Sequence, residues 1–295
     1  MKKTILLLGC ILLIVFLTSC DGRNSDISNE QVRYVIYSYS SSAEENANNA
    51  TSGNIAFESA DKKVFSFSSR TEINRPADAD EKYTLELNGK SYSLYYDKSY
   101  ETAISKSKDH KAYGQFNAYE SDKISAYTRF STNDLLLFTN FDENVCTAKG
   151  DLTEEEARGI ADSALLSLYG ETTKQEYSYE TAVFTDTRLG THYTVVYRKF
   201  VWDVPTNDSI QITVNMNGDI IGVNAKHYGM FSSSESQVSS EELQNAISVI
   251  REKYSEKWTI GTMQLVLDSE GDYYIYAQLS SMSTEEAMEI YINVK

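Results

Sequence analysis

Apolar and polar residues alternate along much of the first half of the chain, which is the pattern of β-strands with one buried face. The first such segment is residues 31–39, where Val32, Tyr34 and Ile36 fall on one side. This segment is predicted to be a strand, with a helix as the alternative.

Residues 54–140 continue the pattern as a series of alternating segments separated by short polar turns. Asn88-Gly89 lies between two of these segments and is a strong signal for a tight hairpin turn. A lysine-rich stretch, residues 100–112, is predicted to be a short helix or an open loop. The pattern therefore predicts a β-rich domain over residues 31–148.

A helical period begins after Gly150. Thr153 and Glu156 have the spacing of a capping box, in which each side chain bonds to the backbone of the other residue. The apolar residues that follow recur at intervals of three and four and form one stripe: Ala157, Ile160, Ala161, Ala164, Leu165 and Leu168. Gly170 is predicted to end this helix. Alternating segments follow it, so residues 151–230 are predicted to be a helix packed on antiparallel strands.

The same order of elements occurs again near the C-terminus. Ser239 and Glu242 form a second capping box, and a second apolar stripe follows: Leu243, Ala246, Ile247, Ile250 and Tyr254. Three alternating segments complete residues 239–295. The chain is thus predicted to be α+β, a β-rich N-terminal region followed by two helix-plus-antiparallel-meander units packed together. Residues 151–295 are predicted to fold alone.

The first residues carry a targeting pattern. Lys2 and Lys3 precede an apolar run that is too short to cross a bilayer as a helix. The run closes on Leu17-Thr18-Ser19-Cys20, which resembles the lipobox of bacterial lipoproteins. The resemblance implies a signal peptide over residues 1–19 and lipid attachment to Cys20. The stretch after Cys20 is polar and has no hydrophobic period, so residues 20–30 are predicted to be a flexible tether. The resemblance also implies a cell-membrane protein whose ectodomain is on the extracytoplasmic face. An uncleaved transmembrane anchor is the alternative.

Residues 151–226 resemble a second family, the PepSY-type domains of exported bacterial proteins. The resemblance rests on the capped helix that begins LTEEEARGIADSALLSLYG, on the strand YTVVYRKF and on the hairpin that ends NGDIIGVNA. It implies a domain of the kind found in propeptides that restrain secreted peptidases and in envelope regulation. It implies no catalytic residue.

The net charge limits the classes of molecule that the protein can bind, and the cysteine content limits its disulfides. The net charge is −16, and loss of the two signal lysines makes it −18, which disfavours nucleic acid as a partner. With Cys10 in the signal and Cys20 lipidated, Cys146 has no partner for a disulfide. Cys146 is predicted to be a small apolar residue in a linker rather than a nucleophile.

Catalytic and metal-binding motifs are missing from the sequence. His110, His192 and His227 are isolated, and no HExxH, GxSxG or CxxC occurs. The acidic stretches at 215–219 and 268–272, and the cluster Asp78, Asp80 and Glu81, lack the full calcium-loop spacing. Turns are the favoured interpretation of all three, so no catalytic, cofactor or metal residue is predicted.

Aromatic residues on two predicted strands form the remaining candidate surface: Tyr193, Tyr197, Trp202, Tyr273, Tyr274 and Tyr276. About half of them are expected in the core, and none is predicted as a site residue.

Two functions stay open. The favoured one is a non-catalytic surface lipoprotein that binds or regulates an envelope or secreted protein. The alternative is a cell-wall glycan or peptide hydrolase that uses scattered carboxylates, which would need a deep cleft with two carboxylates about 5–10 Å apart.

Overall fold

The computed structural model describes the backbone of residues 32–38 and, in addition, residues 70–102, 114–130, 132–187, 190–225, 227–231, 237–267, 272–283 and 286–294. The signal peptide, Cys20, the tether over residues 20–30 and His110 lie outside the described residues. So do the predicted strands between residues 54 and 69, and the stretch that follows Thr102 up to residue 113.

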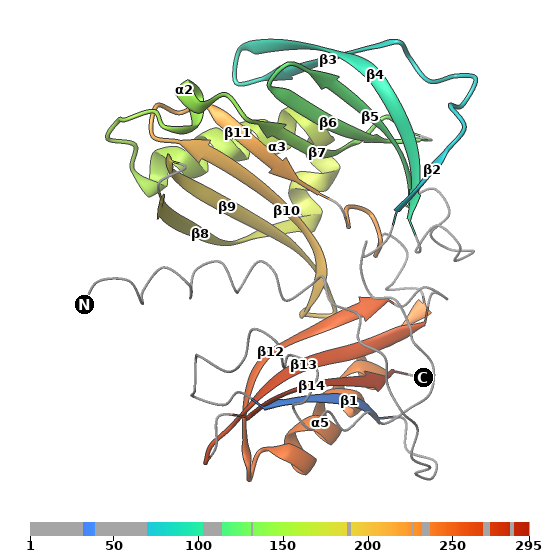
Figure 1. Ribbon diagram of the computed structural model, residues 1–295. Helices are drawn as coiled ribbons and strands as arrows, with labels where there is room; N and C mark the ends of the chain where they lie inside the picture. Colours follow the sequence, from blue (N-terminus) through green and yellow to red (C-terminus); the bar gives the residue numbers. More distant parts are fainter. Residues whose placement is uncertain are drawn as a thin grey trace.

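The described part is built mostly of strands with few helices, so the predicted α+β class is confirmed (Figure 1). Its larger sheet consists entirely of antiparallel neighbours in the spatial order β8-β9-β10-β11-β7-β6-β5-β4-β2, with β3 also on β4. The bounds of these strands are, in chain order, β2 (Arg70–Ile73), β3 (Lys82–Leu87), β4 (Lys90–Thr102), β5 (Gln115–Ser121), β6 (Ile124–Arg129), β7 (Leu135–Asn140), β8 (Tyr177–Thr187), β9 (Gly190–Val201), β10 (Val204–Asn215) and β11 (Ile220–Asn224).

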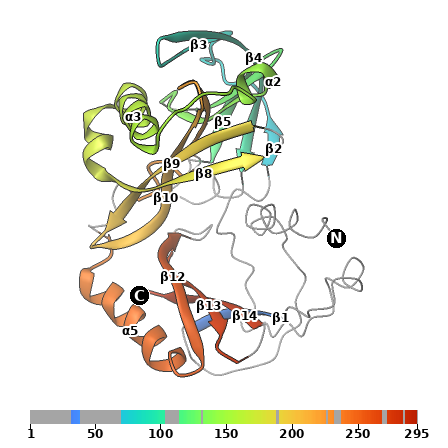
Figure 2. The ribbon, with the colours of Figure 1, turned by 90° about the vertical axis from the view of Figure 1, so that its left-hand side faces the viewer.

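A smaller antiparallel sheet contains β1 (Val32–Ser38), β14 (Glu286–Asn293), β13 (Tyr273–Ser281) and β12 (Trp258–Leu267), in that spatial order. A single parallel pair, Thr206 on β10 with Leu265 on β12, connects it to the larger sheet. Figures 1 and 2 show the two sheets as separate layers, one above the other, with β10 reaching down to the smaller one.

Helix α3 (Glu154–Glu176) covers β8, β9 and β10, and α5 (Ser240–Tyr254) covers the smaller sheet (Figure 2). Both predicted capping boxes are present, because Thr153 and Ser239 accept from the N3 backbone while the N3 glutamate accepts from the cap residue. Both apolar stripes face the core. A short helix, α2 (Glu143–Cys146), was not predicted.

Gly170 kinks α3 instead of ending it. Its φ of 81° and ψ of 176° break the helical geometry, as expected of a glycine that can adopt positive φ. The helix then resumes and runs without a loop into Tyr177, the first residue of β8. The Thr173 hydroxyl supports this last turn by donating to the Tyr169 carbonyl oxygen at 2.9 Å.

The Asn88-Gly89 hairpin is present as predicted. Its two residues have φ of 46° and 76°, the positive values that a two-residue hairpin turn of this kind requires. The turn also contacts a distant segment, because the side-chain amide of Asn88 donates to the Gly218 carbonyl oxygen at 2.9 Å. Lys90 and Asp219 form an ion pair at 2.6 Å beside it. The hairpin is therefore tied to the turn between β10 and β11.

The strands cross the predicted domain boundaries. β7 belongs to the predicted domain over residues 31–148, yet it pairs with β11 of the unit over residues 151–230. β1 belongs to the same predicted domain, yet it pairs with β14 at the other end of the chain. One hydrophobic cluster also joins Leu94, Phe138, Leu165 and Val223. The larger sheet and its core therefore span the position at which the sequence pattern changes.

A second hydrophobic cluster lies between α5 and the smaller sheet. Val201 and Val204, at the turn between β9 and β10, are part of it. Between them, Trp202 donates from its indole nitrogen to the Val238 carbonyl oxygen at 2.8 Å. The hairpin tip of the larger sheet thus reaches into the core of the smaller one. Within the described ranges, no helix is both long and apolar enough to cross a membrane.

Candidate functional site

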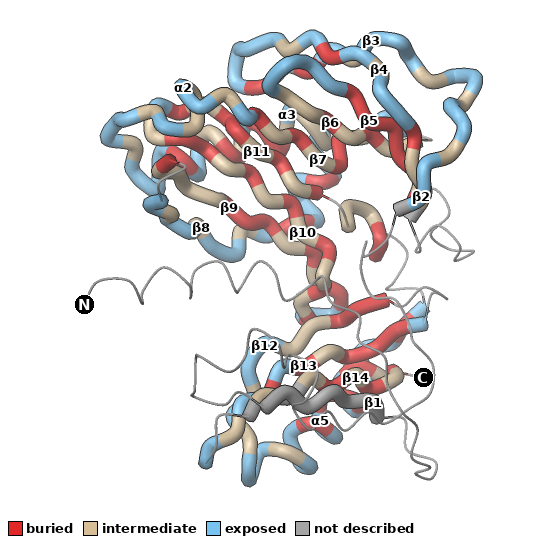
Figure 3. The backbone as a smooth tube through the Cα atoms, viewed as in Figure 1, coloured by how far each residue is buried: buried red, intermediate tan, exposed pale blue. Residues whose placement is uncertain are grey.

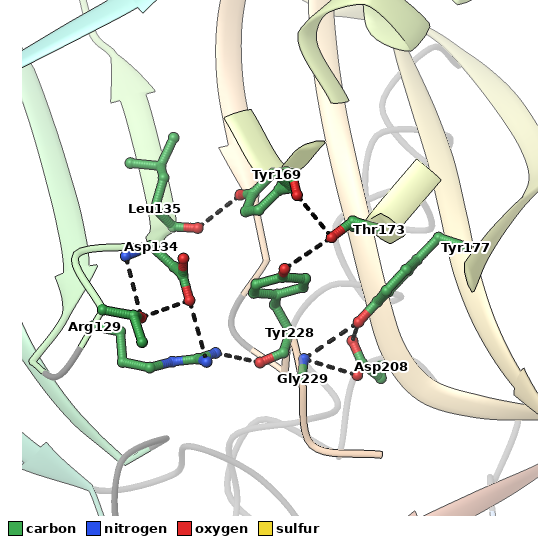
Figure 4. A network of polar contacts seen from close by, with 10 residues as sticks. Arg129, Asp134, Leu135, Tyr169, Thr173, Tyr177, Asp208, Tyr228 and Gly229 are labelled. Carbon is green, nitrogen blue, oxygen red and sulfur yellow. Dashed lines mark hydrogen bonds and ion pairs between the residues drawn. The ribbon is translucent and has the colours of Figure 1, made fainter. Parts of the chain in front are cut away.

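A buried polar network joins the larger sheet to the segment that leads into α5 (Figure 4). Its centre is residues 227–231, a turn between β11 and α5, and we call the network around this turn the junction. The residues that contact the turn are Arg129 on β6, Thr173 on α3, Tyr177 on β8 and Asp208 on β10. Residues of β6, of the consecutive elements α3 and β8, and of β10 therefore converge on one short segment.

Asp208 is the most buried member of the junction, with 0% of its surface exposed. Its Oδ1 accepts from the Tyr177 hydroxyl at 2.8 Å and its Oδ2 accepts from the Gly229 amide at 3.0 Å. The Phe231 amide also donates to it. Burial raises the pKa of this carboxyl to about 7, although these donors and the nearby Lys199 oppose the rise.

Lys199 lies close to Asp208 but is ion-paired elsewhere. Its Nζ is 2.6 Å from Glu176 Oε2, at the end of α3, and it lies 6.0 Å from the centre of the Tyr177 ring. Thr206 completes this side of the junction, because its hydroxyl donates to the Lys199 carbonyl oxygen at 2.9 Å and accepts from the Asp208 amide at 3.1 Å. The Asp208 carboxyl thus has donors on β8 and in the turn, and its backbone amide is bonded within β10.

Tyr228 ties the other side of the turn to α3 and β6. Its hydroxyl lies 2.9 Å from Thr173 Oγ1, and its ring packs on Tyr169 with centroids 4.7 Å apart. Arg129 donates to the Tyr228 carbonyl oxygen and pairs with Asp134 at 3.4 Å. Tyr169 in turn donates to the Leu135 carbonyl oxygen at 2.6 Å.

The turn also connects the two hydrophobic cores. Tyr228 packs against the core of the larger sheet, whereas Met230 and Phe231 belong to the core of the smaller sheet. Gly229 lies between them with a φ of 82°, and its backbone amide donates a hydrogen bond to Asp208. The junction therefore holds the two cores together, and its polar groups are used for structure.

Asp208 was not singled out from the sequence, although a signal was present. It lies in phase with Ile210, Ile212 and Val214, which alternate along β10 and are all buried. A carboxylate in phase with the inward side of a strand must be buried, and a buried carboxylate needs partners. The identity of those partners comes only from the tertiary structure.

The stability of the folded protein is expected to fall as pH rises toward about 7, because of Asp208. An aspartate in an unfolded chain titrates near pH 3.9, so between the two values the folded state holds the extra proton. Each unit of pKa difference corresponds to about 1.4 kcal/mol. The free energy of unfolding of the wild type should therefore decline relative to that of Asp208→Asn over this range and run parallel to it above about pH 8.

The measurement is chemical denaturation of both proteins at a series of pH values. Tyr177→Phe serves as the second variant, because the Tyr177 hydroxyl stabilises the charged carboxylate. The free energy of unfolding of Tyr177→Phe should therefore continue to decline to a higher pH than that of the wild type. If the free energies of unfolding of the wild type and of Asp208→Asn stay parallel from about pH 4 to 8, the raised pKa of Asp208 is contradicted.

The two histidines and the cysteine that the structure describes lie in surroundings that burial, and not a catalytic partner, dominates. His227 is in the junction turn, and burial lowers its pKa to about 4. Burial also lowers the pKa of His192, on β9. Cys146 ends α2, where its thiol lies 3.2 Å from the Asn140 carbonyl oxygen, and burial raises its pKa. A raised pKa leaves the thiol protonated at neutral pH, which is the opposite of an activated nucleophile.

The acidic stretch at 215–219 forms a turn. The buried Asn215 accepts from the amides of Asn217 and Asp219, both at 2.9 Å, and donates to the Val145 carbonyl oxygen at 2.7 Å. The stretch at 268–272 lies mostly outside the described residues. In the parts of the chain that the structure describes, no three His, Cys, Asp or Glu side chains are grouped as a metal would require.

The aromatic residues proposed as a surface are dispersed. Tyr197, Tyr273 and Tyr274 are buried, and Tyr193 packs against the core of the larger sheet. Tyr276 donates to Glu289 at 3.1 Å, and Trp202 is 42% exposed in the turn between β9 and β10. An open surface depression is lined by Glu72, Ile73 and Asn74, and Glu72 is paired with Lys98 at 3.1 Å.

Comparisons with known proteins give one remote likeness. No protein-family model matches the chain, and no curated protein matches it. A solved structure described as the Bacillus megaterium YpeB C-terminal domain is similar over 77% of this chain and 84% of that chain, with 10% identity and a TM-score of 0.35. A likeness this weak assigns neither a fold nor a function to the chain.

Proposed function

We propose that the protein is a membrane-anchored surface lipoprotein that acts as a non-catalytic binding or regulatory module on an envelope or secreted protein. The anchor is supported by Leu17-Thr18-Ser19-Cys20, with lipid on Cys20. The module is supported by the capped helix and antiparallel strands of residues 151–226, which resemble PepSY-type domains. The similar order of elements after Ser239 is proposed to be a second, related unit.

One observation carries the non-catalytic part of the proposal. Asp208 is the carboxyl whose pKa rises to about 7, the value that acid–base catalysis near neutral pH would use. Yet it has no exposed surface, and both of its oxygens are bonded to groups that hold the junction together. A substrate cannot reach it without opening the core. The raised pKa of Asp208 therefore results from its burial in the folded core and does not indicate a catalytic role.

Purified full-length protein is the material for testing this part of the proposal. Incubated with cell-wall glycan or with peptide substrates, it should release no product. Product release by the wild type would support the hydrolase alternative if changing one carboxylate to its amide abolished that release. Such a result would overturn the proposal. Photo-crosslinking in the native envelope is the experiment that identifies the partner of the non-catalytic module.

The anchor gives a separate expected result. Cys20→Ala should abolish incorporation of labelled fatty acid and leave an uncleaved precursor, because the thiol is the group that carries the lipid and two or more chains are needed for stable anchoring. Metabolic labelling followed by mass spectrometry of the N-terminal peptide measures both effects. Cys146→Ala is the matched control and should leave labelling unchanged. A wild-type protein without lipid would contradict the anchor.

A further inference from the structure

Strand β8 is an edge of the larger sheet. It is paired with β9 and, among the strands that the structure describes, with no other (Figure 1). Seven of its eleven residues are exposed, and Figure 3 shows it in pale blue and tan along the rim of the sheet. The outer side of β8 is therefore not paired with any strand that the structure describes, although the Ala182 amide is bonded to the Tyr179 hydroxyl. A long exposed edge is a template on which another extended chain can pair.

The regular part of this edge is Thr181–Thr187. The register between β8 and β9 shifts between Tyr179 and Thr181, so Glu180 forms a bulge, which is a feature that interrupts edge pairing. From Thr181 onward every residue is paired in register, up to Thr187 opposite Gly190. A stretch of this length equals an ordinary strand.

The middle of the regular stretch is apolar. Val183 is 49% exposed and Phe184 is 53% exposed. Because successive residues of a strand point to opposite faces, these two side chains flank the edge on both faces of the sheet. The Phe184 ring is held in place by Tyr193, with centroids 5.1 Å apart. A strand added here would find an apolar neighbour on each face at little ordering cost.

Acidic residues lie toward both ends of this edge, and β8 carries no Lys or Arg. Glu180 is paired with Arg198 at 2.7 Å, whereas Asp186 accepts a hydrogen bond from the neutral Thr191 hydroxyl at 2.8 Å. The whole chain has a net charge of −16. Pairing two copies through β8 would bring two strongly acidic molecules together, which electrostatic repulsion opposes. The same field attracts a basic segment.

We propose that β8 binds, by strand addition along Thr181–Thr187, an extended basic segment of a partner protein. Within this stretch Asp186 is bonded to a neutral hydroxyl, whereas Glu180 already has Arg198 as its ion-pair partner. The segment would therefore carry a basic residue beside Asp186 and apolar residues beside Val183 and Phe184, and a basic residue at each end would reach Asp186 in either strand direction. This inference rests on the proposed function, because it names the chemistry of the partner that the non-catalytic module takes.

Three synthetic peptides test the proposal on the full-length protein in detergent micelles. The first is Lys-Val-Thr-Val-Thr-Val-Lys, the second has Glu in place of both Lys, and the third has Pro in place of the central Val. The first should bind at least about tenfold more tightly than either of the others, as fluorescence anisotropy would measure. Proline removes a backbone donor and glutamate reverses the charge, so the two controls separate strand addition from electrostatic attraction.

Two variants locate the site. Val183→Lys places a positive charge at the centre of the edge and should weaken the first peptide at least about tenfold. Val249→Lys adds the same charge at an exposed apolar residue of α5 and should change little, since Val249 is 40% exposed and distant from β8 in sequence and fold. Hydrogen exchange of residues 177–187 should slow when the first peptide binds.

Several outcomes would overturn the proposal: no peptide binding, equal effects of the two variants, or slowed exchange only in other segments. Concentration-dependent dimers that Val183→Lys dissociates would overturn it in favour of a second copy of the chain. Product release in the hydrolysis experiment would overturn the proposed function, yet it would leave peptide binding to β8 as measured. The two failures are therefore distinguishable.

Discussion

Residues 151–295, expressed without the first 150 residues, are expected not to fold cooperatively. The sequence pattern predicts that this part folds alone, and the structure argues against it. Removing the preceding residues would strip β7 from β11 and β1 from β14, leaving two strands with unpaired edges. It would also remove Phe138 from the larger core, in which it is completely buried.

The size of the effect follows from how many large apolar side chains the core would lack. Burial of a Leu or Phe side chain contributes about 1.5–3 kcal/mol, and the fragment is without five of them from the larger core: Leu85, Leu87, Leu94, Leu135 and Phe138. It also lacks Tyr119, which is completely buried in the same core. A whole protein is stable by only about 5–15 kcal/mol. The fragment is therefore expected to give poorly dispersed amide spectra and no sharp thermal transition.

The matched control supplies the missing half in trans. Residues 21–150, mixed with the fragment, should restore a cooperative transition, because β7 can again pair with β11. A fragment that unfolds cooperatively by itself would show that α3, β8, β9, β10 and β11 need no support from β7.

Leu165→Ala is expected to cost about 2–5 kcal/mol in the full-length protein, measured by chemical denaturation. Leu165 lies on the inner side of α3, is 1% exposed and belongs to the core of the larger sheet. Its removal would leave a cavity that a helix held at both ends cannot close. One end is fixed by the capping box at Thr153 and the other by the direct connection to Tyr177.

Ser167→Ala is the matched control on the same helix. Ser167 is exposed two residues further on and precedes the kink at Gly170. Alanine is the better helix former in both substitutions, so Ser167→Ala should be neutral or stabilising by a few tenths of a kcal/mol. Arg158 is less suitable as a control, because its guanidinium lies 4.1 Å from the centre of the Tyr179 ring. Equal effects of the two substitutions would show that α3 does not pack through Leu165.

Local structure is the part of this protein that the sequence by itself determined. The Asn88-Gly89 turn, the two capping boxes and the alternating strands are each specified by residues within about ten positions of one another. Both helical stripes face their cores, because an apolar face has one favourable place in an α+β protein. The kink at Gly170 marks the limit of this logic, since glycine permits a break and does not say whether the helix resumes.

Which strands lie side by side was decided by the tertiary structure. The pairing of β7 with β11, and of β1 with β14, joins segments whose alternation looks the same as that of any other strand. Period 2 tells which face of a strand is buried and contains no information about its neighbour. The change of pattern at Gly150 is therefore a change of local structure, and the sheet and core continue across it.

The junction and the edge strand also come from the fold alone. In the sequence, Asp208 is one of 43 acidic residues; only the convergence of Tyr177, Gly229 and Phe231 on it makes it a buried carboxyl with a raised pKa. Likewise, Val183 and Phe184 resemble residues of a central strand until β8 is found at the rim of the sheet. Burial and position in a sheet are properties of the whole chain, because they depend on contacts between segments that local periodicity cannot specify.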